Sequence, residues 1–195
     1  MSNIHPHATL PRYDKETLLG QQGVVLWFCG LSGSGKSTIA AGVERVLHQQ
    51  GRFTIRLDGD NLRTGLNANL GFSDDDRLEN IRRTAEMAKI LAQNGVIVLC
   101  SLITPRGMHR DLVRGILDDD FALIHVKASF AACEARDVKG LYAKAAKGEV
   151  ANFTGRDSGF EEPQNAELVL DTEKLTAEDA VSEVLEFLSG RAAAV

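Results

Sequence analysis

The sequence predicts an α/β protein built as a three-layer sandwich around one parallel, doubly wound sheet. Short apolar runs rich in β-branched residues alternate with longer segments of helical period along the whole chain. The runs are apolar throughout instead of alternating with polar residues, as a sheet covered on both faces requires. Right-handed crossovers between parallel strands then place helices on both faces.

Five apolar runs are expected as strands, over 24–29, 53–57, 96–100, 121–126 and 168–170. Four helices are expected over about 37–50, 76–93, 109–117 and 177–188. In the second of these, Ile81, Ala85 and Ala88 recur at the spacing of one helical face. Two polar segments, 61–75 and 136–162, interrupt the pattern, and long connections of this kind commonly carry binding sites or lids.

Length and composition restrict the classes of protein that are possible. The 195 residues are expected to form a single domain over 1–195, with an N-terminal arm over 1–20 and a lid-like segment over 136–162. A net charge of −5 argues against a general binder of nucleic acid or of anionic membranes. No apolar run approaches the roughly 20 residues that span a bilayer. The first twenty residues are too polar for a secretory signal.

The three cysteines, Cys29, Cys100 and Cys133, are widely spaced, and the first two lie in apolar runs. Buried free thiols in a reducing compartment are therefore expected, and with them a cytoplasmic protein. The five histidines lack the mutual spacing of metal ligands.

Residues 30–37 read GLSGSGKS and match the Walker A pattern between an expected strand and an expected helix. The glycines allow successive main-chain N–H groups to turn toward phosphate oxygens, and the helix start adds its positive dipole end. Lys36 supplies a charge to the β- and γ-phosphates, and the Ser37 hydroxyl suits Mg²⁺. The residues expected to hold ATP are Gly30, Ser32, Gly33, Ser34, Gly35, Lys36, Ser37 and Thr38. The pattern alone does not separate kinases from GTPases, motor proteins or transport ATPases.

Asp58 and Asp60 follow the second expected strand. Because the carboxyl ends of parallel strands converge on one crevice, both carboxylates are expected beside the triphosphate. Phosphoryl transfer to a hydroxyl uses one carboxylate near the metal and another near the attacking oxygen. The alternative is an ordinary acidic turn, since Asp and Gly favour turns.

The two polar segments concentrate cations and aromatic residues. Arg forks suit phosphate or sulfate oxygens, and a Phe offers a face on which a base can stack. About half of these cations are expected to be ordinary solvated surface. The residues concerned are Arg63, Phe72, Arg77, Arg82 and Arg83 in the first segment and the start of the helix after it, and Arg136, Lys139, Tyr142, Lys144, Lys147, Phe153 and Arg156 in the second segment.

Five strings together resemble the adenylylsulfate kinase family: GLSGSGKS at 30–37, LDGDNLRTG at 57–65, LGFSDDDRLENIRR at 70–83, EARDVKGLY at 134–142 and NFTGRDS at 152–158. The resemblance runs from about residue 19 to the last expected helix. It implies a P-loop nucleotide kinase fold and a homodimer. The implied reaction transfers the γ-phosphate of ATP to the 3′-hydroxyl of adenosine 5′-phosphosulfate (APS), giving 3′-phosphoadenylyl sulfate (PAPS) and ADP in sulfate activation.

The resemblance also implies roles for single residues. Mg²⁺ would be held by Ser37 and, through water, by Asp58, while Asp60 accepts or orients the attacking proton and Lys36 stabilises the transferring group. The APS adenine would stack between Phe72 and Phe153, and the lid would close over it. The implied substrate-binding residues are Asp60, Arg63, Phe72, Arg77, Asn80, Ile103, Thr104, Lys139 and Phe153.

The chain departs from the family pattern at a few positions. Thr104-Pro105 stands where Ser-Pro is usual, with a Ser regarded as phosphorylated, and Arg106-Gly107 stands where an aromatic residue or His is followed by Arg. If that Arg touches a ligand, Arg106 or Arg110 would have to replace it. Two alternatives therefore stay open: a kinase of this fold with another nucleotide-type acceptor, and a P-loop regulatory protein without transfer activity. Association with the sulfurylase that makes the acceptor is also left open.

Overall fold

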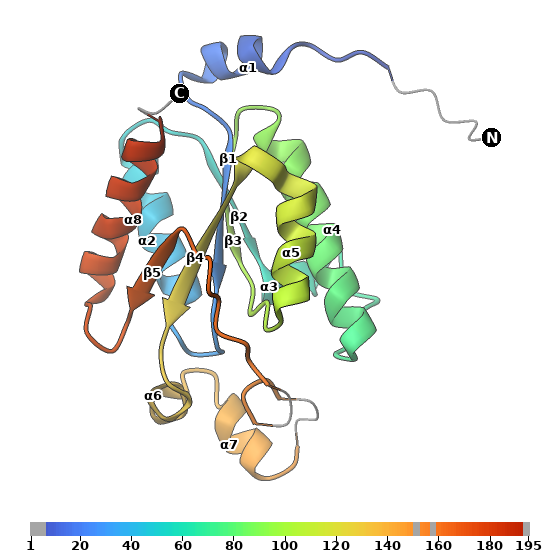
Figure 1. The fold of residues 1–195 in the computed structure, drawn as a ribbon, viewed down its shortest axis with the longest axis vertical. Helices are drawn as coiled ribbons and strands as arrows, with labels where there is room; N and C mark the ends of the chain where they lie inside the picture. The colour runs from blue at the N-terminus through green and yellow to red at the C-terminus, as the bar shows by residue number, and fades with distance from the viewer. Residues whose placement is uncertain (1–6, 150–152, 157–158, 193–195) are drawn as a thin grey trace, which may run out of the picture.

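Five parallel strands form one sheet in the order β2-β3-β1-β4-β5 (Figure 1). The computed structural model describes residues 7–149, 153–156 and 159–192. The strands are β1 (Val24–Cys29), β2 (Thr54–Asp58), β3 (Ile97–Ser101), β4 (Phe121–Lys127) and β5 (Leu168–Asp171). The predicted fold class, a parallel sheet inside a three-layer α/β sandwich, is confirmed.

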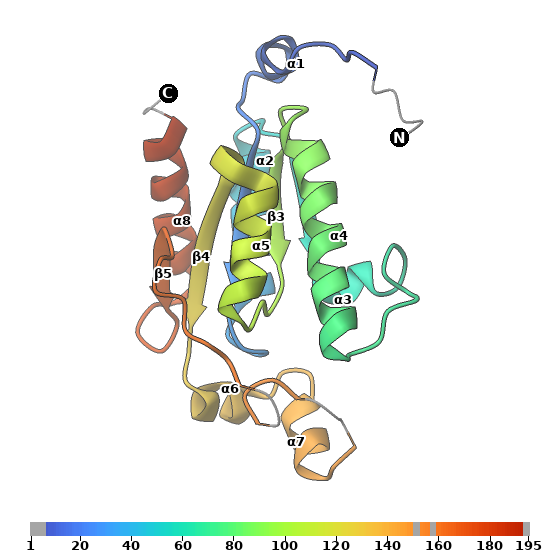
Figure 2. The ribbon, with the colours of Figure 1, turned by 45° about the vertical axis from the view of Figure 1, so that its right-hand side comes forward.

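Helices cover both faces of this sheet (Figures 1 and 2). On one face lie α2 (Lys36–Gln49) and α8 (Ala177–Ala192), and on the other lie α4 (Asp74–Ala92) and α5 (Gly107–Leu117). The shorter helices are α1 (Arg12–Leu19), α3 (Gly59–Leu62), η1 (Asp118–Asp120), α6 (Phe130–Arg136) and α7 (Leu141–Ala146). Within the described part of the chain, no helix combines the length and apolarity needed to cross a membrane.

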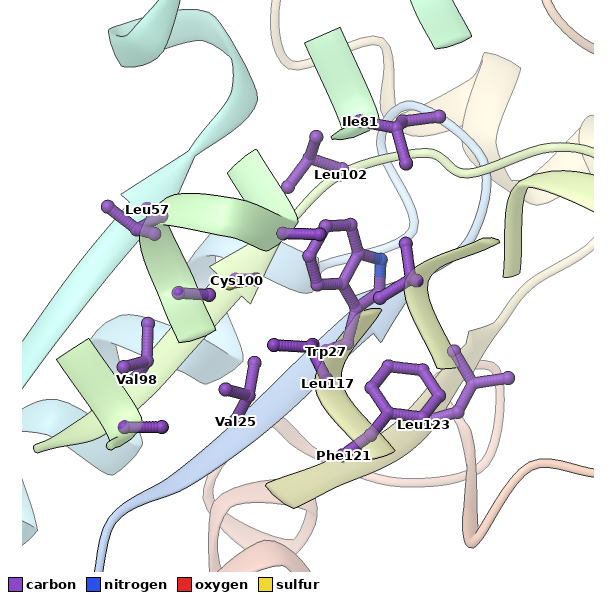
Figure 3. Packing of buried hydrophobic residues seen from close by; sticks show 14 of the residues in the cluster. Val25, Trp27, Leu57, Ile81, Val98, Cys100, Leu102, Leu117, Phe121 and Leu123 are labelled. Atoms are coloured by element: carbon purple, nitrogen blue, oxygen red, sulfur yellow. The ribbon is translucent and has the colours of Figure 1, made fainter. Parts of the chain in front are cut away.

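The central strand β1 divides the hydrophobic core in two, and all six of its residues are buried. Trp27 points into the cluster beneath α4 and α5, where it packs beside Leu117 and Phe121 (Figure 3). Leu26 and Phe28 point into the opposite cluster beneath α2 and α8. Both sides of the strand therefore need apolar residues, which explains its unbroken apolar run. Cys29, Cys100 and Cys133 are buried free thiols, as predicted.

The first polar segment is shorter than expected. α3 begins directly after β2, and α4 begins at Asp74, before the residue expected from the periodicity. The Ser73 hydroxyl caps α4 by accepting a hydrogen bond from the Asp76 main chain, and three acidic residues occupy the first turn. Such residues favour a helix N-terminus, although the apolar stripe that signals a helix starts only a turn later.

The second polar segment contributes buried residues, although no apolar stripe in its sequence indicated them. It contains α7, in which Tyr142 and Ala145 are buried. These residues form a small third cluster with Leu31, Cys133 and Phe153. A helix of this length is too short to show a periodic stripe in the sequence. Residues 150–152 and 157–158, part of the predicted lid and of the NFTGRDS string, lie outside the described residues.

The expected N-terminal arm contains α1, which lies at the end of the sheet opposite to α6 and α7 (Figure 1). Arg12 connects it to the sheet: its guanidinium lies 2.8 Å from the Asp120 carboxylate and donates a hydrogen bond of 2.8 Å to the Gly23 carbonyl. α1 is therefore held away from the carboxyl ends of the strands, where the predicted site residues lie.

Candidate active site

A cavity of about 540 Å³ lies at the carboxyl ends of the central strands. One end is lined by the P-loop from Ser32 to Thr38, and the other by Arg63, Phe72 and Arg77. All the predicted ATP and acceptor residues line it except Gly30 and Ser34. The topology explains the convergence, because loops that follow neighbouring parallel strands meet at one edge of a sheet.

The P-loop joins β1 to α2 with a backbone that only glycine permits at its start. Gly30 has φ +146°, and a Cβ there would lie 2.3 Å from the Val126 carbonyl oxygen. α2 begins at Lys36 without a side-chain cap, so its first N–H groups are left for a ligand. A helix start of this kind binds phosphate readily.

The Lys36 side chain is buried and folds back onto its own loop. Its ammonium donates hydrogen bonds to the main-chain oxygens of Gly30 (3.0 Å) and Leu31 (2.7 Å). Burial lowers the pKa of Lys36 to about 8, and the nearby positive charge of Lys139 acts in the same direction. The ammonium is held by these two neutral carbonyl groups, and a bound phosphate would supply a negatively charged partner for it.

Ser37 and Asp58 bring oxygen ligands together beside the P-loop. The Ser37 hydroxyl donates a hydrogen bond of 2.6 Å to one Asp58 oxygen, and the other accepts from the Asp60 main chain at 3.0 Å. Hard oxygen ligands of this kind fit Mg²⁺, which takes few protein ligands and completes its shell with water and phosphate. Within the described residues, no group of three or more His, Cys, Asp or Glu side chains is placed to hold a metal ion.

Arg63, Phe72 and Arg77 form the far wall of the cavity. The Arg63 guanidinium lies 4.4 Å from the centre of the Phe72 ring, which remains 60% exposed. Arg63 also donates to the Gly71 carbonyl at 2.7 Å, and Arg77 donates to the Phe72 carbonyl at 3.0 Å. Burial lowers the pKa of both arginines. This wall therefore offers an exposed ring face beside two cations.

The lid segment contacts the P-loop through Tyr142, whose hydroxyl donates a hydrogen bond of 2.8 Å to the Ser32 carbonyl. Phe153 packs edge-on against the Tyr142 ring at 4.8 Å between centroids and is 7% exposed. The Arg77 guanidinium of α4 donates a hydrogen bond of 2.8 Å to the Thr154 hydroxyl and so connects α4 to the lid. Tyr142 was predicted only as one of the aromatic residues of the lid segment, although its place in the EARDVKGLY string was a signal for a closer role.

Two further predicted residues are already paired. Asn80 is buried and accepts a hydrogen bond of 2.9 Å from Asn67. Lys139 of the lid contacts the carboxylate of Asp60. Of the nine cations named in the two polar segments, Arg63, Arg77 and Lys139 line the cavity. Arg82 and Arg83 instead bind Glu79 and lower its pKa to about 2.

The stretch 104–107, where the chain departs from the family pattern, is engaged in contacts within the protein. The Thr104 side chain is 1% exposed, and its hydroxyl accepts a hydrogen bond of 2.8 Å from Trp27. It is therefore not placed as an exposed phosphorylation site. Arg106 pairs with Asp74 at 2.7 Å, and Arg110 donates to the Thr104 carbonyl at 3.0 Å. Neither arginine lines the cavity, so neither replaces the family's Arg as a ligand contact there.

Comparison with known proteins identifies the family. The sequence model described as adenylylsulphate kinase matches residues 22–171. The chain belongs to the adenylylsulfate kinase family. The adenylyl-sulfate kinase of Bacteroides fragilis is 51% identical over 193 residues, which cover 97% of this chain and 96% of that protein. The Clostridium kluyveri adenylyl-sulfate kinase is 49% identical over 189 residues, covering 96% and 95%.

A solved structure of the adenylylsulfate kinase family shares the fold. The Mycobacterium tuberculosis APS kinase CysC, solved in complex with AMPPNP and APS, is 45% identical with a TM-score of 0.84. The match covers 87% of this chain and 99% of that one. The relatives thus match the chain along almost its full length.

Proposed function

We propose that this chain is an adenylyl-sulfate kinase that transfers the γ-phosphoryl group of ATP to the 3′-hydroxyl of APS, giving PAPS and ADP. One observation carries the proposal: a single cavity holds a P-loop at one end and the cationic, aromatic wall of Arg63, Phe72 and Arg77 at the other. The near-full-length identity of about half to adenylyl-sulfate kinases supports the choice of acceptor.

ATP lies on the P-loop, with its phosphates on the main-chain N–H groups at the start of α2 and on Lys36. Binding draws the Lys36 ammonium away from the Gly30 and Leu31 carbonyls that hold it in the free protein. Ser37 and, through water, Asp58 would hold Mg²⁺, and the ion would supply positive charge to neutralise the phosphates.

The acceptor occupies the other end of the cavity. Its adenine stacks on the exposed face of Phe72, with Phe153 on the lid side. Arg63, Arg77 and Lys139 bind the phosphosulfate and ribose, and Asn80 and the main chain of Ile103 and Thr104 complete the pocket. Asp60 lies between the two ends and accepts or orients the proton of the attacking 3′-hydroxyl.

The lid over 136–162 closes on the bound substrates and excludes water, which limits transfer of the phosphoryl group to solvent. Tyr142 supports this role because it already connects the lid to the P-loop. We further infer from the family resemblance a single-domain, cytoplasmic homodimer. Association with a sulfurylase stays a prediction.

A coupled assay of ADP release tests the proposal. APS should stimulate turnover at low concentration, and mass spectrometry should identify PAPS as the product. ATP binding without stimulation by APS would contradict it. A panel of other adenine nucleotides separates the alternatives: stimulation by one of them alone would indicate a different acceptor, and no ADP from any would indicate a regulatory protein.

A further inference from the structure

Trp27, the only tryptophan of the chain, connects the central strand to the wall of the cavity. Its side chain is completely buried in the cluster beneath α4 and α5. The indole N–H donates a hydrogen bond of 2.8 Å to the hydroxyl of Thr104. Thr104 itself lines the cavity. A core residue is thus bonded directly to a residue of the site.

Thr104 has an unfavourable main-chain conformation. Its φ is +47°, in the left-handed region that β-branched residues rarely adopt. Such a conformation persists only where the surroundings fix it. Here the Trp27 indole holds the side chain, and the buried Arg110 guanidinium holds the carbonyl at 3.0 Å. The conformation is therefore imposed by partners on β1 and α5.

The conformation of Thr104 has a consequence for the cavity. Among the described residues, none accepts a hydrogen bond from the main-chain N–H of Ile103 or Thr104. Both residues line the cavity, Thr104 buried and Ile103 half-buried, and buried main-chain donors are rarely left without a partner. The turn at Thr104 thus leaves donors for a polar ligand, whereas the Ile103 carbonyl is already bonded to the P-loop at Gly30.

The Trp27 indole is surrounded by apolar side chains from several elements. Ile81 and Leu102, which pack in the same cluster as Trp27, also line the cavity (Figure 3). The Phe121 ring lies against the indole from the opposite side, at 6.5 Å between centroids. Packing from several elements fixes the orientation of the indole N–H, so the bond to Thr104 has a defined direction.

We propose that Trp27 is a positioning residue for the acceptor nucleotide: its hydrogen bond holds Thr104 in the left-handed conformation that directs main-chain donors at the acceptor. The inference rests on the proposed function, because it takes the acceptor to bind at this wall. ATP binds at the other end of the cavity, on the P-loop. Loss of this hydrogen bond therefore weakens binding of the acceptor and leaves binding of ATP unchanged.

The test compares Michaelis constants for the two substrates in full-length variants. Thr104→Val keeps the shape and the β-branch but removes the hydroxyl, and Trp27→Phe removes the donor. Each should raise KM for APS about fivefold, the value of one lost hydrogen bond, and leave KM for ATP nearly unchanged. In the double variant, KM for APS should rise no further than in the more strongly affected single variant, because both substitutions remove the same hydrogen bond. Thr104→Ser should restore the wild-type value.

Gln21→Met is the matched control. Gln21 is also buried and makes three hydrogen bonds, to Phe53 and Gly95, but at the opposite end of the sheet. Its loss should lower the melting temperature without changing either Michaelis constant. A merely structural role for Trp27 would give the same pattern as this control.

A second readout needs no turnover. The single indole N–H gives one resonance in a ¹⁵N spectrum, which should move in Thr104→Val, stay in Thr104→Ser, and respond to APS in the wild type. An active wild type whose Thr104→Val variant keeps its KM for APS overturns this inference alone. A wild type that does not use APS overturns the proposed function and this inference with it.

Discussion

Lys139 of the lid forms an ion pair with Asp60, the second residue of α3, which begins directly after β2. The two side chains are half exposed or more, 51% for Lys139 and 68% for Asp60. A predicted base and a predicted substrate ligand thus neutralise each other in the free protein. In the proposed reaction the acceptor enters between these two side chains, so the ion pair would link the position of the lid to the availability of Asp60.

Replacement of Lys139 by Met should therefore impair the use of APS far more than it affects folding. A charged hydrogen bond to substrate is worth about 1.5–3 kcal/mol, so kcat/KM for APS should fall about 10- to 100-fold. Exposed ion pairs contribute only about 0–1 kcal/mol to stability, so the melting temperature should hardly change. Lys174→Met, which removes an exposed pair with Asp171 outside the cavity, should leave kinetics unchanged. Normal kinetics in Lys139→Met would refute the role.

Asp60→Asn should lower kcat by about 10²- to 10⁴-fold, the usual contribution of a general base. The amide keeps the size and one oxygen of the side chain, so substrate binding should be affected less than turnover. Asp75→Asn is the control, because Asp75 is exposed in the first turn of α4 and does not line the cavity. Initial rates at saturating ATP and APS give the comparison. Full activity of Asp60→Asn would remove Asp60 from the mechanism.

Phe72→Ala should weaken binding of APS, because the adenine loses the ring on which it stacks. A base on an aromatic ring is worth about 1–3 kcal/mol, which predicts a rise in KM for APS of about 5- to 100-fold. The ring is 60% exposed, so its removal should cost little stability. Phe53→Ala provides a matched control, since Phe53 is 53% exposed and lies outside this cavity. Equal KM values for the two variants would show that no base stacks on Phe72.

Local sequence patterns predicted the parts of this site that are formed by residues close together in the sequence. The Walker A string identified the P-loop, and the apolar run before it identified β1. Contacts between distant residues left no such pattern. Trp27 and Thr104 are separated by 77 positions, and Tyr142 and Ser32 by 110, so no periodicity or spacing indicates either bond. The pairing of Lys139 with Asp60 also depends on how the lid folds back over the sheet.

Tyr142→Phe should affect the donor end of the cavity. The variant keeps the ring that packs on Phe153 but loses the bond to the Ser32 carbonyl. KM for ATP should rise about fivefold, with KM for APS unchanged, which is the reverse of the Thr104→Val pattern. Burial raises the pKa of Tyr142, so the hydroxyl remains a donor at neutral and mildly alkaline pH. Tyr13→Phe, on the exposed surface of α1, is the control. A selective effect on APS would contradict the assignment.

Lys36 should make nucleotide binding and stability depend on pH. Burial lowers its pKa to about 8 in the ligand-free protein, against an ordinary value of 10.5. Between these values the unfolded chain holds the proton and the folded chain has lost it. More protons on the unfolded state mean that the free energy of unfolding rises with pH. Burial of the Lys36 ammonium therefore destabilises the ligand-free fold at neutral pH. That destabilisation is relieved as pH rises from about 8 toward 10.5.

Nucleotide binding should show the opposite trend, because phosphate favours the charged form of Lys36 and raises its pKa. Above pH 8 the protein must take up a proton to bind ATP, so affinity should fall by up to about tenfold per pH unit. Calorimetry with a non-hydrolysable ATP analogue, in buffers of different ionisation enthalpy, measures that proton directly. Uptake should be small at pH 7 and approach one proton at pH 9. Lys174→Met should retain this behaviour, and Lys36→Met should lose it together with most of the affinity. Constant proton uptake from pH 7 to 9 would mean that Lys36 is fully charged before the nucleotide arrives.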